Sequence, residues 1–377
     1  MLVLAGTLAF NCAAEDGEGY LVTETGNENP SFCAFNDVIG LLKDGDTVRL
    51  MGNVKSDRQL VIEGITVTID LNGHTLTLNV KNGDLKAKGE GNGEAPALAV
   101  TAGKNPGRLL LEGAGRMDVN GPIGVYADGG SSATVTKAAG GMHGHGALAV
   151  DVGSTITVLG NATGTYAGAR AEDGGVIYVE GNAYAGLGAY AGGMGAQAYG
   201  DGSKVTVLKD ARGFFHGVGA EDNGTVVVKG NVEGKQVGVY AVDGATVEVG
   251  GSVNWSGVND DFINFGVYVD RSANVYIGGD VNADSAVGHA VVFYPSYEGR
   301  ETAVTIDGEI ASKCGYLKVD GVNCLLDNAE IITTKRGYRT YTNEGRNTTV
   351  WLKDDSSVSA PTDNSLSNPD TGASLKH

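Results

Sequence analysis

Short apolar and β-branched runs alternate with small residues and polar turns through the middle of the chain. Each unit opens with Gly, two variable residues and Ala or Val, and a run such as Thr155–Val158 follows the turn. The openings lie at Gly124, Gly146, Gly168, Gly195, Gly217, Gly238, Gly266 and Gly288, spaced by 22, 22, 27, 22, 21, 28 and 22 residues. Repeats of roughly 20–50 residues mark solenoids, propellers or arrays.

The repeat length and the residue types select one of these architectures. Runs of four or five residues rich in Val, Ile and Thr predict short strands, whereas a propeller blade needs about 40 residues. Helical repeats are disfavoured because the chain contains 61 Gly, which weakens helix interiors. We therefore expect an all-β fold: a right-handed parallel β-solenoid, or β-helix, of about 22-residue coils with a short N-terminal capping helix.

Equivalent positions of such a repeat should stack from coil to coil. The Gly openings would let the coils close tightly, and the Gly-Asn pairs at Asn161, Asn182 and Asn231 would hydrogen-bond along the axis. Carboxylates should form a column of Asp128, Asp151, Asp173, Asp201, Asp222, Asp243 and Asp270. No cofactor is expected unless Ca²⁺ binds between coils, with Asp151, Asp173, Asp222 and Asp243 as candidate ligands. The simpler interpretation is that Asp and Gly are good turn formers.

Composition narrows the range of partners. The 377 residues include 27 basic and 45 acidic side chains, a net charge of −18, which disfavours nucleic acid and anionic membrane surfaces. The four cysteines fall in two local pairs, Cys12/Cys33 and Cys314/Cys324. Local pairs suit end staples in an oxidising compartment, although buried free thiols fit Cys314 and Cys324 equally well.

Both ends of the chain suggest where the protein is found. Residues 1–14 are mostly apolar and resemble the remnant of a secretory signal peptide, too short to span a bilayer. Residues 353–377 form a polar linker that contains Asn368, Pro369, Asp370, Thr371 and Gly372. This motif resembles the NPxTG and LPxTG sorting signals of Gram-positive bacteria. The resemblance implies attachment to cell-wall peptidoglycan by a sortase, and hence an extracellular, wall-attached protein.

The segment before the repeats also has familiar features. Residues 32–42 are amphipathic and predict a short helix within an N-terminal cap of residues 15–45, with the solenoid at 46–352. The blocks "KDGDTVRL" at 43–50 and "TIDLNGHTL" at 68–76 resemble secreted, sortase-anchored β-helix surface proteins of Gram-positive bacteria. A cap is physically expected, because an open solenoid end is an unpaired sheet edge.

Insertions that interrupt the repeat are the candidate binding segments. Residues 183–194 and 255–265 should emerge at one corner of the solenoid, three coils or roughly 14 Å apart, and 294–300 should leave at another. Aromatic rings and carboxylates on exposed loops suit sugar binding. The candidate ligand-binding residues are Trp255, Asp260, Asp261, Phe262, Tyr294 and Tyr297. The alternative is that these aromatic rings fold back and cover a local gap.

No clustered acid–base set is visible in the sequence. Gly144-His145-Gly146 is similar to the GHG element of β-helical polygalacturonases, but Asp260 and Asp261 follow it by about five coils, or roughly 24 Å. His145 is therefore expected to be a turn residue. Paired threonines such as Thr155 and Thr157 are too scattered for an ice-binding face.

Three hypotheses of function follow. The first is a structural or adhesin-like surface protein that binds glycans or a host surface and catalyses no reaction. The alternative is a polysaccharide-active enzyme, a lyase or glycoside hydrolase, on the same fold. An ice-binding solenoid is a third class. Fold alone does not decide between them.

Overall fold

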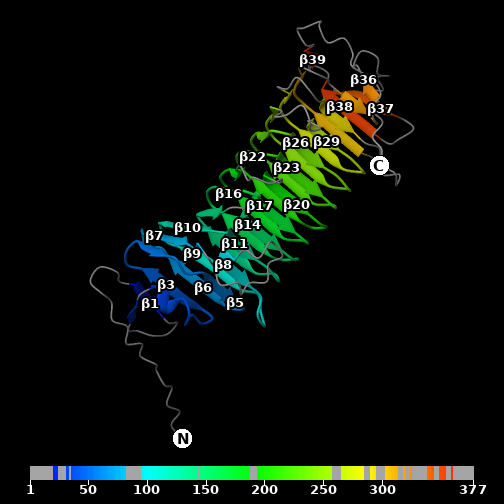
Figure 1. Ribbon diagram of the computed structural model, residues 1–377. Coiled ribbons are helices and arrows are strands. Elements are labelled where there is room, and N and C mark those ends of the chain that lie inside the picture. The colour runs from blue at the N-terminus through cyan, green and yellow to red at the C-terminus, as the bar shows by residue number, and fades with distance from the viewer. Residues whose placement is uncertain are drawn as a thin grey trace.

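Three parallel sheets wrap around one apolar core that runs along the length of the molecule (Figure 1). The computed structural model describes residues 20–23, 31–33, 35–81, 95–141, 144–186, 193–256, 265–283, 289–293, 302–312, 317–319, 322–324, 338–343, 348–353 and 358–359. The chain passes from sheet A to sheet B to sheet C and then into the next coil. This is the expected right-handed parallel β-solenoid.

Sheet A forms one wall, and antiparallel strands lie at both of its ends. Its strands are β1 Tyr20–Thr23, β2 Ser31–Cys33, β3 Asp46–Leu50, β6 Thr66–Asp70, β9 Arg108–Glu112, β12 Ser132–Val135, β15 Thr155–Val158, β18 Val176–Val179, β21 Lys204–Val207, β24 Thr225–Val228, β27 Thr246–Val249, β30 Asn274–Ile277, β33 Thr302–Ile306, β37 Tyr338–Asn343 and β38 Thr348–Lys353.

Sheets B and C form the other two walls. Sheet B contains β4 Val54–Ser56, β7 Thr75–Asn79, β10 Arg116–Gly121, β13 Lys137–Gly140, β16 Ala162–Gly164, β19 Ala183–Ala185, β22 Ala211–Gly213, β25 Val232–Gly234, β28 Val253–Trp255, β31 Val281–Ala283, β34 Ile310–Ser312 and β39 Val358–Ser359. Sheet C contains β5 Leu60–Glu63, β8 Pro96–Thr101, β11 Ile123–Ala127, β14 His145–Val150, β17 Ala167–Glu172, β20 Met194–Tyr199, β23 His216–Glu221, β26 Val237–Ala241, β29 Phe265–Val269, β32 His289–Phe293, β35 Leu317–Val319 and β36 Val322–Cys324.

Alternation within the strands places the apolar side chains inside. In β15, Ile156 and Val158 are buried while Thr155 is exposed, as the two-residue period of a strand requires. In-register pairing continues each apolar position through the next coil, so that Ile156 lies beside Ile177 and Val158 beside Val179. The core is therefore a set of columns of Val, Ile, Leu and Ala.

The glycine column expected from the repeat is present in sheet C. Gly146, Gly217 and Gly266 occupy one register position, and a Cβ at Gly146 would lie 2.5–2.7 Å from backbone atoms of the next coil and of sheet B. Only hydrogen fits there. The prediction is wrong at its last member, because Ala290 and not Gly288 takes that position in β32. Gly288 itself lies outside the described residues.

Side chains at the corner between sheets A and B hydrogen-bond along the axis, as the Gly-Asn pairs predicted. Each side-chain oxygen accepts a hydrogen bond from a backbone N–H of the next coil. The pairs are Asn161 with Asn182 at 2.9 Å, Asn182 with Asp210 at 3.1 Å, Asp210 with Asn231 at 2.8 Å, and Asn231 with Ser252 at 2.9 Å. This ladder satisfies backbone donors where the chain bends between strands.

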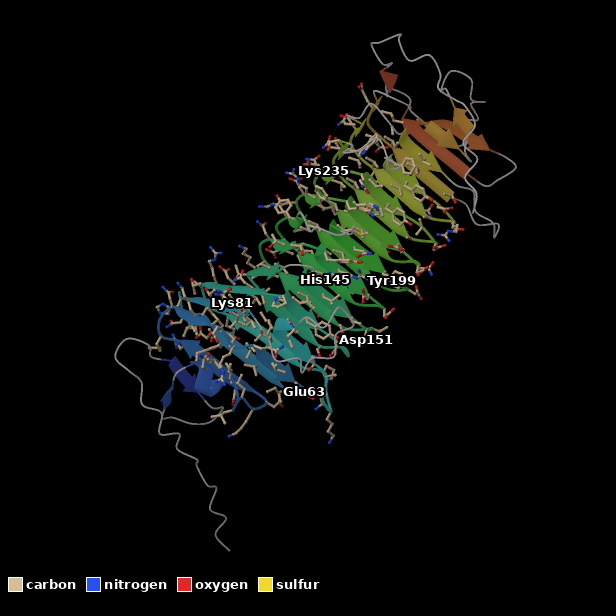
Figure 2. All side chains as sticks on the ribbon, in the orientation of Figure 1. Glu63, Lys81, His145, Asp151, Tyr199 and Lys235 are labelled. Carbon is tan, nitrogen blue, oxygen red and sulfur yellow. The ribbon has the colours of Figure 1, made fainter. Side chains whose placement is uncertain are left out.

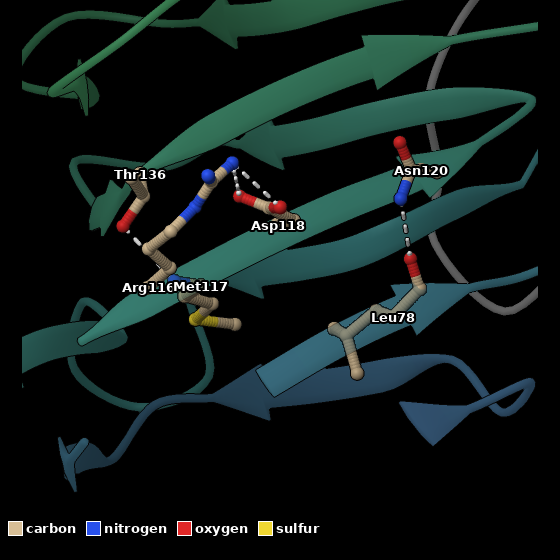
Figure 3. Close-up of polar contacts among 6 residues, drawn as sticks. All are labelled: Leu78, Arg116, Met117, Asp118, Asn120 and Thr136. Carbon is tan, nitrogen blue, oxygen red and sulfur yellow. Dashed lines mark hydrogen bonds and ion pairs between the residues drawn. The ribbon is translucent and has the colours of Figure 1, made fainter. Parts of the chain in front are cut away.

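Similar contacts connect the coils elsewhere (Figure 3). The Asn120 Nδ2 donates to the backbone oxygen of Leu78 at 3.2 Å, and the backbone N–H of Met117 donates to Thr136 Oγ1 at 2.9 Å. Arg116 and Asp118, both on the outer face of β10, form an exposed ion pair at 2.9 Å. The outer face of sheet B is thus polar, and its polar groups are partly engaged with each other.

The N-terminal cap combines strands with a short helix. The helix α1, Phe35–Val38, has four residues, fewer than the segment 32–42 predicted, and β1 and β2 extend sheet A with antiparallel pairing. Asn36 on α1 accepts a 2.6 Å hydrogen bond from Ser56 of β4. At the other end, β39 pairs with β34 beyond the predicted solenoid boundary of 352. No helix in the described ranges has the length and hydropathy to span a membrane.

Adding a single methyl group to the glycine column should destabilise the solenoid. We expect Gly195→Ala to lower the free energy of unfolding by about 1–3 kcal/mol, because its Cβ would lie 2.6–3.0 Å from three backbone atoms of neighbouring strands. The control is Gly52→Ala, whose Cβ meets nothing within 4 Å. Thermal unfolding measures both variants, and equal midpoints would contradict tight closure of the column.

Candidate functional site

Trp255 does not lie on an exposed loop. It ends β28, its side chain is 1% exposed, and it belongs to the apolar core. The expectation that this ring is available to a sugar is wrong. Trp255 belongs to a strand of the solenoid wall and not to the insertion that follows it.

The corner between sheets B and C explains why a tryptophan fits there. Trp255 occupies the same register position as smaller residues that end the other strands of sheet B. These residues are Gly164, Ala185, Gly213, Gly234 and Ala283. In coils with a tight corner a side chain is impossible, because a Cβ at Gly213 would lie 1.6 Å from the His216 backbone oxygen. After Ala185, Trp255 and Ala283 the chain runs several residues further before it re-enters sheet C. In these coils the corner position carries a side chain.

The other predicted ligand-binding residues and the sorting motif lie outside the described residues. These are Asp260, Asp261, Phe262, Tyr294 and Tyr297, and the sorting motif Asn368, Pro369, Asp370, Thr371 and Gly372. Their roles as binding or anchoring residues stay predictions.

A groove of about 420 Å³ lies on the outer face of sheet B, beside the corner between sheets A and B. It is lined by Tyr184, Asp210, Ala211, Arg212, Asn231, Glu233 and Asn254. These residues come from the adjacent strands β19, β22, β25 and β28 and the turns before them, so the groove extends over three strand spacings, roughly 14 Å. The excursions at 187–192 and 257–264 follow the first and the last of these strands.

The groove combines an aromatic ring with groups that hydrogen-bond in both directions. Arg212 Nη2 lies 3.1 Å from Glu233 Oε1, and both side chains are substantially exposed, at 56% and 41%. Asn254 Oδ1 accepts a 3.0 Å hydrogen bond from Asn282. The half-exposed Tyr184 ring lies at the start of this row. The groove therefore presents one aromatic ring beside charged and amide groups, which can donate and accept hydrogen bonds.

Sequence reasoning missed this groove, although a signal was present. Tyr184, Arg212, Glu233 and Asn254 are the middle residues of successive three-residue strands, separated by 28, 21 and 21 residues. The two flanking residues of each strand point inward. The middle residues of successive three-residue strands therefore form the outward-facing row of sheet B.

The turn between sheets C and A gathers the acidic residues that were considered as calcium ligands. Asp151, Asp173, Asp222 and Asp243 all have positive φ, between 49° and 73°, a conformation that Asp and Asn tolerate better than most residues. Backbone hydrogen bonds align them in one row, but Gly200 separates Asp173 from Asp222. Arg271 continues the row and pairs with Asp243 at 3.0 Å. Within the part of the chain that is described, no group of three His, Cys, Asp or Glu side chains is arranged to hold a metal ion.

A second row of acids follows the edge of sheet C and includes every other coil. Glu63, Asp128, Glu172, Glu221 and Asp270 alternate with Thr101, Val150, Tyr199 and Val242. Two strand spacings separate successive carboxylates, roughly 9.6 Å, which weakens their repulsion relative to adjacent coils. Burial raises the pKa of Asp128, Glu221 and Asp270. Glu63 and Asp128 also line a pocket of about 660 Å³ beside α1.

His145 lies on sheet C and is not a turn residue (Figure 2). It begins β14, is buried, and meets Tyr166 edge to face with ring centroids 5.0 Å apart. Burial lowers the pKa of His145 to about 3, so the ring is neutral and a poor proton acceptor at neutral pH.

Comparison of the sequence with protein-family models, and of the chain with curated proteins and solved structures, gives no significant match.

Adjacent residues of β28 should respond in opposite ways to substitution. Trp255→Ala should lower the free energy of unfolding by about 3–5 kcal/mol, because it empties a filled core position. Asn254→Ala, one residue away on the outer face, should change stability by about 1 kcal/mol or less. Thermal unfolding of both variants tests the burial of Trp255, and equal losses would contradict it.

Proposed function

We propose that the protein is a secreted, wall-attached surface protein whose solenoid displays a glycan-binding groove. The observation that carries the proposal is the row of Tyr184, Arg212, Glu233 and Asn254 along the outer face of sheet B. The Tyr184 ring offers a face for the C–H groups of a sugar, and the guanidinium, carboxylate and amide groups suit its hydroxyls.

The rigidity of the sheet supports binding at this groove. Each of the four side chains stands on a strand that is hydrogen-bonded on both sides, so little ordering is needed when a ligand arrives. Equivalent positions repeat at the strand spacing, which favours an extended, repeating ligand over a compact one. A polysaccharide or the glycan of a host surface has that form.

Attachment to the cell wall is proposed from the sequence motif at 368–372 and from its resemblance to sortase signals. A long solenoid with a wall anchor would act as a stalk and hold the groove away from the cell. In this proposal the protein binds its glycan without breaking bonds.

Binding should depend on the ring of Tyr184. On a glycan array we expect wild-type protein to retain a subset of oligosaccharides, and Tyr184→Ala to lose at least 10-fold in affinity for them, about 1.4 kcal/mol. Tyr178→Ala is the matched control, because Tyr178 is a partly exposed tyrosine on the outer face of sheet A. Equal losses in both variants, or no retained glycan, would contradict the proposal.

A reducing-end assay on the retained glycans separates binding from hydrolysis. No new reducing ends are expected. If reducing ends accumulate and Asp128→Asn in the pocket beside α1 abolishes them, a polysaccharide-active enzyme, a hydrolase or a lyase, replaces the binding protein.

The anchor motif can be tested separately. Incubation with a sortase that accepts NPxTG signals and an amine acceptor should cleave the chain between Thr371 and Gly372, and mass spectrometry should find Thr371 joined to the acceptor. Thr371→Ala should abolish the transfer. Transfer that persists in this variant would exclude the motif as the sorting signal.

A further inference from the structure

The cross-section of the solenoid is electrically asymmetric. Lys81 and Lys235 lie along the long edge formed by sheet B, whereas Glu63 and Asp151 lie along the opposite edge (Figure 2). The groove and the two corners of its coils carry the basic residues Lys209, Arg212, Lys229 and Lys235 and the acidic residues Glu180, Asp210 and Glu233. Counted over the described residues alone, four positive and three negative charges make this surface nearly neutral, in a chain whose net charge is −18.

The acids of the same coils collect on the far side. Glu172, Asp173, Glu221 and Asp222 all lie at the turn between sheets C and A, at the ends of β17 and β23. An anionic molecule is therefore repelled from that edge and meets the least unfavourable potential at sheet B. Charge distributions of this kind orient the approach of charged ligands.

Arg212 provides the local contact for an anion. Its guanidinium stands in the middle of the groove with 56% of the side chain exposed, and its ion pair is one 3.1 Å contact between Nη2 and Glu233 Oε1. An exposed pair of this kind contributes little to stability, so sharing the guanidinium with a ligand is inexpensive. A guanidinium carries five N–H donors in a planar fork that matches carboxylate or sulfate oxygens.

The rims of the groove carry further cationic side chains. Lys209 and Lys229 are exposed at the corner between sheets A and B. Lys235 lies at the corner between sheets B and C, where its Nζ stands 4.8 Å from the centre of the Phe214 ring. Cationic groups thus border both sides of the row that contains Tyr184 and Arg212.

We infer that the sheet B groove selects an anionic glycan, an oligosaccharide that carries carboxylate or sulfate groups. This inference rests on the proposed glycan-binding function and adds the class of sugar. Arg212 meets the acidic group of one sugar, Tyr184 contacts a neighbouring ring, and Lys209 and Lys229 lie beside the acidic groups of further units. Glu233 orients the guanidinium and rejects ligands whose acidic group falls one coil away.

Titration calorimetry of the full chain against three matched sets of oligosaccharides tests the inference. The probes are a uronate oligosaccharide, a sulfated oligosaccharide and a neutral oligosaccharide of the same length. We expect one of the acidic probes to bind at least 10-fold more tightly than the neutral one. Its affinity should fall as salt is raised from about 50 to about 200 mM, because the Debye length shortens over this range. The uronate and sulfate arms identify the acidic group.

Two variants locate the charge contact. Arg212→Ala should reduce the affinity for the acidic probe at least 10-fold and by a clearly larger factor than the affinity for the neutral probe, and Arg212→Lys should restore part of the loss. Lys204→Ala is the control, because Lys204 is an exposed cation on sheet A. Unchanged affinity in Arg212→Ala, or an equal loss in Lys204→Ala, would overturn the inference.

The outcomes separate this inference from the proposed function. If the neutral probe binds as tightly as the acidic probes and Tyr184→Ala abolishes that binding, the groove binds glycans but does not select anions. If none of the probes binds and the glycan array is also empty, the proposed function fails and the inference fails with it.

Discussion

In-register parallel stacking is the constraint on which the whole molecule depends. Each residue lies about 4.8 Å from its equivalents in the coils before and after it, so a side chain is selected chiefly by two neighbours of the same kind. A column of inward-facing positions holds one valine after another in successive coils, as at Val205 and Val226. Where a Cβ would clash with the opposite wall, a position in the glycine column accepts hydrogen alone, as at Gly146 and Gly168, whereas Ala290 occupies the same column in β32.

The same constraint governs charge and hydrogen bonding. An amide or carboxylate at a corner finds a backbone N–H of the next coil at hydrogen-bond distance, which is how Asn161 and Asp210 are satisfied. A carboxylate on an outer face instead lies beside the carboxylate of the next coil and is repelled by it when the equivalent residue there is also acidic. The edge of sheet C avoids this by placing an uncharged residue between acids, with Tyr199 between Glu172 and Glu221.

Periodicity in the sequence was enough to predict the solenoid, its coil length and the glycine column, because these follow from residues that recur at fixed spacing. It failed at Gly288, where an excursion before the strand shifts the apparent opening by two residues and Ala290 takes the place. It also failed at Trp255, since a hydrophobic residue beside an excursion can lie before or after the point where the chain leaves the wall. The groove was not predicted because the residues that line it are neighbours only across coils, as Tyr184 and Arg212 are.

The corner between sheets B and C has a consequence for how such a chain can change over evolutionary time. Residues at that corner are glycine where the coil turns tightly and Ala or Trp where the chain departs, as at Gly234 and Trp255. An insertion at this point relieves a steric conflict without disturbing either wall. The corner therefore tolerates new segments one coil at a time, and duplication of a coil would carry such a segment to a new height along the axis while every sheet keeps its register.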